Sequence, residues 1–223
     1  KRVITNSADQ TAKIWSLTGQ LLVDMKGHVG EVFFARVNKG ESKVITHAND
    51  GLVKSWSLYE NLTMSLDNHM PYIKTANFSA DGGRIITASA DNTAKIWNIS
   101  GLLLTDLKGH QGAVEDAVFS TDGKLALTAS SDNSAKLWRV AKGEQQRYLM
   151  SFWHQDNVNA VEFSPDNKLI LTASEDGTAR LWNLRGFEQA RFTHDSTQVT
   201  DAFFVANGTE IITQSKNGQL KRW

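Results

Sequence analysis

The chain of 223 residues contains no cysteine, which excludes disulfides, thiolate metal ligands and a cysteine nucleophile. Its 24 basic and 24 acidic side chains cancel, which disfavours bulk electrostatic binding to nucleic acid or to an anionic membrane. No apolar run approaches the roughly 20 residues of a membrane-spanning helix. The beginning of the chain also lacks the apolar core of a signal peptide, so we expect a cytoplasmic protein with no membrane partner.

Proline is almost absent as well, with two residues in the whole chain, which fits dense pairing of β-strands. The sequence has no sustained 3.6-residue apolar period of the kind that an amphipathic helix requires. Instead, short apolar segments such as 113–119 and 168–174 alternate with turn signals that contain Asp, Asn and Gly. These patterns predict an all-β protein.

One nine-residue phrase recurs six times, and its clearest copy is SADNTAKIW at residues 89–97. The final Trp of each copy follows the previous one at intervals of 41, 41, 41, 44 and 41 residues. A Thr lies ten residues before every such Trp, a basic residue lies two before it, and most copies have a His 28 before it. Each period contains four short strand-like segments, so the copies must stack to bury both faces of each small sheet.

These features resemble the WD-repeat family, whose β-propeller blades of about 40–45 residues carry His and Trp-Asp signatures. The resemblance rests on KGH at 26–28 and 108–110, on FSPDN at 163–167 and on the repeated Asp turns, and the uniformity of the copies is typical of bacterial arrays. The Asp that names the family is replaced by Ser, Asn or Arg after each of the five repeat Trp residues that another residue follows. The resemblance implies a β-propeller of four-stranded antiparallel blades.

Counting strands predicts a single domain over residues 1–223 that forms an incomplete ring. Four full blades would be flanked by two partial ones. The predicted blades are 1–26 (partial), 30–67, 71–108, 112–153, 156–193 and 198–223 (partial). We therefore expect a fragment of a longer propeller, whose remaining blades would be partners of this chain.

In the WD-repeat family, a His before the blade, a Ser on the second strand, the Asp of the next turn and the Trp of the third strand form a hydrogen-bonded set. The resemblance carries complete sets to His69, Ser89, Asp91 and Trp97, to His110, Ser130, Asp132 and Trp138, and to His154, Ser174, Asp176 and Trp182. An indole N–H only donates and a carboxylate only accepts, and a His between them can donate to the acid.

The same residue types could indicate a Ser-His-Asp hydrolase. However, the trio occurs several times, each time with a Trp, and no GxSxG elbow accompanies it. The repeated His residues are about one blade apart, which disfavours a metal site. We therefore predict a structural role for the sets, no enzymatic activity, no metal and no cofactor.

Function is expected where the blades differ, on the face that carries the Asp turns and the loops leading into the first strands. We call the variable residues of this face the rim, and their mixture of chemistries suits protein or peptide recognition. The rim consists of Phe33, Asn49, Tyr72, Lys74, Glu115, Ser131, Trp153, Asn157, Asn159, Glu175, Thr200 and Lys216. Trp153 lies outside the Trp register, and it is either an exposed binding residue or a strand residue that packs locally.

Two further features allow two interpretations each. The basic residue before each Trp could bind phosphate, but such side chains are usual in the family, and their stems can cover apolar surface. His47 is the one His outside the repeat register, and such a lone His is usually structural or exposed.

The sequence thus predicts a noncatalytic interaction scaffold that presents a rigid rim to a protein or peptide partner. The alternative is a sensor or regulatory arm of a larger signalling ATPase, kinase or caspase-like protease, by analogy with bacterial arrays. An enzyme built on a propeller is less favoured, because no unrepeated cluster of His, Asp, Glu or Ser is visible. A nucleic-acid reader is disfavoured by the absence of net charge, and salt-dependent retention on DNA or RNA would revive it.

Overall fold

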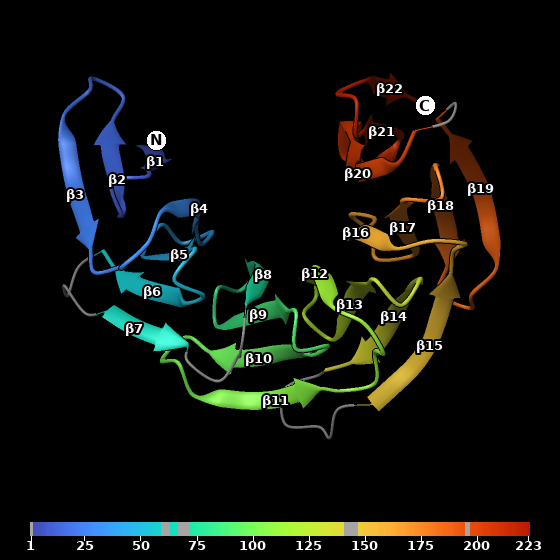
Figure 1. The fold of residues 1–223 in the computed structure, drawn as a ribbon, viewed down its shortest axis with the longest axis horizontal. Helices are drawn as coiled ribbons and strands as arrows, with labels where there is room; N and C mark the ends of the chain where they lie inside the picture. The colour runs from blue at the N-terminus through green and yellow to red at the C-terminus, as the bar shows by residue number, and fades with distance from the viewer. Residues whose placement is uncertain (1, 59–62, 67–71, 141–146, 195–196) are drawn as a thin grey trace.

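The strands of the protein form six antiparallel sheets, which Figure 1 shows side by side as the blades of an open arc. The computed structural model describes residues 2–58, 63–66, 72–140, 147–194 and 197–223. Within these residues the only helical segment is the 3-10 turn Ala206–Gly208, and no helix is long and apolar enough to cross a membrane. The predicted all-β propeller with an incomplete ring is confirmed.

Blades one and six have three strands each, and blades two to five have four. Blade one contains β1 (Arg2–Asn6), β2 (Thr11–Ser16) and β3 (Leu21–Lys26). Blade two contains β4 (Val32–Val37), β5 (Lys43–Ala48), β6 (Val53–Ser57) and β7 (Thr63–Leu66), and blade three contains β8 (Ile73–Phe78), β9 (Arg84–Ser89), β10 (Ala94–Asn98) and β11 (Leu103–Leu107). Blade four contains β12 (Val114–Phe119), β13 (Leu125–Ser130), β14 (Ser134–Arg139) and β15 (Arg147–Trp153). Blade five contains β16 (Val158–Phe163), β17 (Leu169–Ser174), β18 (Thr178–Asn183) and β19 (Glu188–Thr193), and blade six contains β20 (Val199–Val205), β21 (Glu210–Ser215) and β22 (Leu220–Arg222).

The repeated Asp turn joins the two central strands of each blade. In blade three, Asn92 adopts a left-handed backbone conformation (φ 68°), which Asn and Gly tolerate better than other residues. The Oδ1 atom of Asp91 accepts the backbone N–H of Thr93 at 2.9 Å and closes the turn. Gly177 has a similar conformation in blade five (φ 81°). An Asp followed by Asn or Gly therefore favours this turn through local interactions alone.

The hydrophobic core lies between neighbouring blades. Val53 and Leu66 of blade two pack in one cluster with Ile73 and Trp97 of blade three, and all four are buried. Equivalent clusters join each of the other pairs of successive blades. Because both faces of an inner blade are covered, its central strands are apolar on both sides, as in other fully buried sheets.

The two end blades differ from the inner blades in what covers them. Figure 1 shows blades one and six on either side of the opening of the arc. Val3 of blade one is 45 % exposed, whereas Val44, at the same repeat position of blade two, is fully buried. Leu220 of blade six is 61 % exposed, whereas the equivalent Val53 is fully buried. Each end blade therefore covers one face against a neighbour and leaves apolar side chains of the other face in solvent.

Candidate functional site

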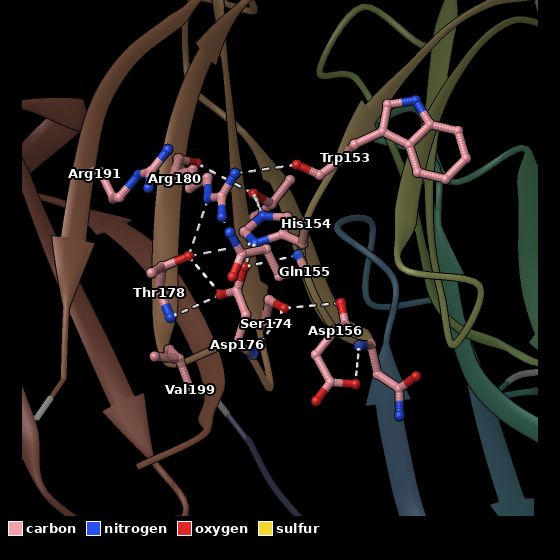
Figure 2. A network of polar contacts seen from close by, with 12 residues as sticks. Trp153, His154, Gln155, Asp156, Ser174, Asp176, Thr178, Arg180, Arg191 and Val199 are labelled. Carbon is pink, nitrogen blue, oxygen red and sulfur yellow. Dashed lines mark hydrogen bonds and ion pairs between the residues drawn. The ribbon is translucent and has the colours of Figure 1, made fainter. Parts of the chain in front are cut away.

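A buried chain of hydrogen bonds lies beneath the Asp turn of blade five. His154 Nδ1 faces Asp176 Oδ2 at 2.9 Å, as Figure 2 shows, and His154 Nε2 faces Thr172 Oγ1 at 2.7 Å. The indole Nε1 of Trp182 donates to the same Thr172 oxygen at 2.9 Å. Because a carboxylate only accepts, Nδ1 carries the proton, and Nε2 accepts from the threonine hydroxyl. The order of the network is thus Trp, Thr, His and Asp.

The same arrangement recurs in other blades with nearly identical distances. In blade four, His110 contacts Asp132 at 2.8 Å and Thr128 at 2.7 Å, and Trp138 donates to Thr128 at 2.9 Å. Blade two has the corresponding bonds among His28, Asp50, Thr46 and Trp56. Blade six keeps His194, Thr213 and Trp223 but has Asn217 in the Asp position. In blade three Trp97 donates to Thr87, and the predicted His69 lies outside the described residues.

The serines of the predicted sets hydrogen-bond to backbone groups, whereas a catalytic serine would hydrogen-bond to a histidine. Ser174 Oγ donates to the backbone carbonyl of Asp156 at 3.0 Å and accepts the backbone N–H of Asp176 at 3.1 Å. Ser130 and Ser89 make the same two contacts in blades four and three. In these three blades the serine hydroxyl therefore ties the Asp turn to the preceding loop, and in blades four and five, where the histidine is described, it does not pair with the imidazole.

Sequence reasoning missed the threonine that connects histidine to tryptophan. The signal was present, because a Thr precedes the Trp by ten residues in all six copies. Its role was not evident from spacing alone, since the hydroxyl must accept from the indole and donate to the imidazole at once. Thr46, Thr87, Thr128, Thr172 and Thr213 are all completely buried.

Burial keeps the imidazoles of the network neutral. Desolvation lowers the pKa of His110 and of His154, and the neighbouring carboxylate only partly opposes it. Desolvation alone would raise the pKa of Asp132, but hydrogen bonds from Ser134, the Gln111 N–H and His110 bring it down to about 2. The network therefore pairs a neutral His with an ionised Asp at neutral pH, which is a stable structural arrangement.

The aromatic members of the rim are exposed to solvent. Phe33 is 50 %, Tyr72 57 % and Trp153 58 % exposed, whereas Trp182 of the repeat register is 7 % exposed. Figure 2 shows the Trp153 ring directed away from the His154 network. The ring lies beside Lys136, whose Nζ is 5.6 Å from the ring centroid.

The polar members of the rim connect neighbouring blades. Lys74 of blade three forms an ion pair with Glu115 of blade four at 3.1 Å. Gln198 Nε2 of blade six donates to Glu175 Oε2 of blade five at 3.2 Å. Within blade five Asn157 Nδ2 donates to the same oxygen at 3.3 Å, and within blade six Lys216 Nζ donates to Gln198 Oε1 at 2.8 Å. Polar contacts of the rim thus link blade three to four and blade five to six.

Four rim residues remain, and three of them use their side chains to hold backbone. Asn159 donates to the Val199 carbonyl at 3.0 Å, Thr200 to the Gln214 carbonyl at 3.2 Å and Ser131 to the Ala113 carbonyl at 3.4 Å. Asn49 is exposed. The first three residues contribute to the architecture of this face as well as to its surface.

His47 is buried, with 2 % of its surface exposed, in a position where the inner blades three to five have alanine. The ring of Phe33 packs edge-on against it, with 4.4 Å between ring centroids. Desolvation lowers the pKa of His47 to about 4. In blade two the exposed Phe33 therefore packs against a buried, neutral histidine. The sequence alone did not indicate this contact.

A cavity of about 410 Å³ opens on the inner side of the arc, between the first strands of the blades. Its wall carries Asp116, Glu162 and Asp201, together with Arg36, which donates a hydrogen bond to Asn77. Desolvation raises the pKa of Asp116 and raises that of Glu162 to about 7. The described residues contain no group of three or more His, Cys, Asp or Glu side chains that could hold a metal ion.

Comparison with protein families gives three matches along the chain. Residues 60–98, 101–139 and 146–183 each match the model of the WD domain, G-beta repeat, and together they cover more than half of the sequence. Each matched segment reaches from the outer strand of one blade to the Trp-bearing strand of the next. A comparison with curated proteins gives no match.

Proposed function

Because the chain belongs to the WD-repeat family, whose propellers generally mediate contacts between proteins, we propose that it is a noncatalytic scaffold that presents its rim to a protein or peptide partner. The observation that carries the proposal is the exposure of Phe33, Tyr72 and Trp153 at 50–58 % on an otherwise hydrogen-bonded face. Large aromatic side chains contribute most of the binding energy in typical protein interfaces.

The rigidity of the rim supports the same proposal. The turns beneath it are fixed by the buried His, Thr and Trp network, and its polar side chains already bridge adjacent blades. A surface that is ordered before binding loses less conformational entropy when a partner docks. The varied chemistry around the arc, from aromatic to polar, gives such a surface the means to select one partner.

The proposal is tested by comparing two double variants of the tagged protein as bait in its native cell. Phe33→Ala with Tyr72→Ala removes two of the three exposed aromatic side chains of the rim. Leu102→Ala with Phe187→Ala is the matched control, because these side chains are 64 % and 65 % exposed. They lie in turns between the third and fourth strands of their blades, which an up-and-down sheet places at the end opposite the rim.

We expect the partners that co-purify with the wild-type protein to be lost from the rim variant and kept by the control. Both variants should melt within a few degrees of the wild type, because all four side chains are at least half exposed. Partners kept by the rim variant, or lost equally from both variants, would contradict the proposed role of the rim.

A further inference from the structure

The outer edge of blade four differs from the other outer edges. Its strand β15 has seven residues, whereas the outer strands of the other blades have four to six. β15 pairs with β14 on one side, and in the part of the chain that the structure describes no strand pairs with its other side. Such an edge presents free backbone N–H and C=O groups that an extended peptide can pair with.

A buried ammonium group lies directly behind this edge. Lys136 of β14 is 8 % exposed, and its Nζ donates to Ser151 Oγ at 3.1 Å. The same nitrogen lies 5.7 Å from the centroid of the Tyr148 ring and 5.6 Å from that of Trp153. An ammonium has three N–H donors, so one hydroxyl acceptor leaves two of them without a conventional partner.

The equivalent basic residues in neighbouring blades have carboxylate partners. Lys95 of blade three pairs with Asp106, which stands opposite it on the outer strand, at 3.1 Å. Arg180 of blade five pairs with Asp176 at 2.7 Å and is 3.7 Å from Glu188. In blade four, Ser151 occupies the place opposite the cation, and no carboxylate among the described residues lies within ion-pair distance of Lys136.

The surface around this cation is aromatic and basic. Tyr148 and Trp153 are 48 % and 58 % exposed, and Arg147 at the start of the strand is exposed. The segment 147–153 contains no acidic residue. A buried cation without a counter-ion is unfavourable, and a carboxylate supplied by a ligand would be held strongly beside two rings that exclude water. Charge complementarity therefore selects an acidic occupant.

We propose that the outer edge of blade four binds an extended acidic peptide, whose Asp or Glu carboxylate pairs with Lys136 between Tyr148 and Trp153. Backbone pairing with β15 supplies affinity for an extended chain, and the carboxylate supplies selectivity. The inference rests on the proposed function in that it treats the protein as a peptide-binding module. It concerns the outer edge, however, and shares only Trp153 with the rim.

The first variant for a test is Ser151→Asp, which places a carboxylate opposite Lys136 as Asp106 stands opposite Lys95. The introduced carboxylate should pair with Lys136 within the protein, keep the fold and block an acidic ligand. Ser65→Asp is the matched control, because Ser65 stands opposite Lys54 at the same position of blade two. Lys54 already donates to the Gly27 carbonyl at 2.7 Å.

The experiment begins with random heptapeptides displayed on phage, selected on the full 223-residue chain. A selected peptide is then synthesised with its acidic residue or with the matching amide, Gln or Asn, and titrated by calorimetry. We expect the selection to enrich Asp or Glu, and we expect the acidic peptide to bind the wild type at least ten-fold more tightly than the amide form. Ser151→Asp should abolish this difference, and Ser65→Asp should retain it.

The inference is overturned if no acidic sequence is enriched, if the two peptides bind equally, or if Ser151→Asp keeps the preference. Lys136→Met, which keeps most of the apolar stem, should also lose the preference, and its melting curve shows whether it folds. The rim variant Phe33→Ala with Tyr72→Ala should bind the acidic peptide like the wild type. Partner capture that depends on the rim, without acidic selectivity, would leave the proposed function standing and remove this inference alone.

Discussion

Asp176 and Glu175 are neighbours in the chain, yet they belong to two different regions of blade five. Asp176 is almost completely buried, and it accepts hydrogen bonds from His154 and Arg180 at 2.9 and 2.7 Å. Glu175 lies on the rim, where it accepts a bond from Gln198 of the next blade at 3.2 Å. The position of Asp176 is Asp in five of the six copies, whereas the position of Glu175 differs in nearly every copy.

One turn therefore contains both a residue that holds the blade together and a residue that is available for recognition. The repeated residue closes a network inside its own blade, so any blade needs it for the same reason. The variable residue contacts whatever the neighbouring blade presents, and its free surface faces solvent. Repetition therefore identifies the scaffold, and variation identifies the surface available for recognition. The predictions below alter one region or the other.

The largest effect is expected from removing a repeated tryptophan of an inner blade. Trp97 is 1 % exposed and packs between blades two and three, so Trp97→Ala should reduce the free energy of unfolding by about 3–5 kcal/mol. Trp15, at the same repeat position of the end blade, is only partly buried, and Trp15→Ala should cost about 1–2 kcal/mol. Urea unfolding measures both values, and equal losses would contradict the difference between inner and end blades.

The next effect concerns the threonine of the network. Thr172→Val keeps the shape of the side chain but leaves His154 Nε2 and the Trp182 indole without their bonds. Unpaired buried groups cost about 1–3 kcal/mol each, so the unfolding free energy should fall by about 2–4 kcal/mol. Thr193→Val, at an exposed position, should change it by less than about 0.5 kcal/mol. A Thr172→Val variant as stable as this control would show that the network has no structural value.

The dependence of stability on pH tests buried His47 and partly buried Glu162, whose effects oppose one another. The pKa of His47 is about 4 in the folded protein, below its ordinary value of 6.5. As pH falls from 6.5 to 4, the histidine is therefore protonated in the unfolded chain while it stays neutral in the folded protein. Stability is lost across that window by about 2 kcal/mol. The pKa of Glu162 is about 7, above its ordinary 4.5, so its contribution is present below 4.5 and is lost as pH rises through 7.

Variants separate these two contributions. His47→Ala should flatten the acid side of a plot of melting temperature against pH, because the proton uptake of the unfolded chain at this position is removed. Glu162→Gln should remove the loss of stability that this group causes as pH rises from 4.5 to 7, and it should therefore steepen the net loss of stability as pH falls from 6.5 to 4. An unchanged profile in either variant would show that the corresponding group does not titrate as its surroundings require.

The smallest effect is expected from the polar part of the rim. Lys216 is exposed, and its bond to Gln198 is made in solvent, so Lys216→Ala should change the unfolding free energy by less than about 0.5 kcal/mol. If urea unfolding shows a loss of unfolding free energy above 1 kcal/mol, Lys216 stabilises the fold. That result would contradict the distinction between the scaffold and the recognition surface.

The spacing of Trp and Thr was sufficient to predict the blades, because a four-stranded sheet with two apolar faces must repeat to be buried. The contacts that differ from blade to blade could not be predicted in the same way. The aromatic setting of Lys136 depends on β15, which begins eleven residues later, and on its pairing with β14, which shifts register between Leu137 and Trp138. The burial of His47 beneath Phe33 depends on a residue fourteen positions earlier in another strand.

The network illustrates a second limit. The His, Asp and Trp were identified from their resemblance to a family pattern. Thr172 was recognised only as a residue that recurs at a fixed spacing. Periodicity shows that a residue is required, but it does not show which atoms meet. That information came from the three-dimensional arrangement, in which one hydroxyl serves both the indole and the imidazole.

The most direct test of the account compares two tryptophans near blade five, Trp182 in the repeat register and Trp153 outside it. Unfolding free energy and capture of the partner are measured on the same preparations of Trp182→Ala and Trp153→Ala. We predict that Trp182→Ala loses about 3–5 kcal/mol of stability while its folded fraction still binds, and that Trp153→Ala loses less than about 1 kcal/mol but binds poorly. Equal destabilisation by both variants, or normal binding by Trp153→Ala, would contradict the separation of scaffold from recognition surface.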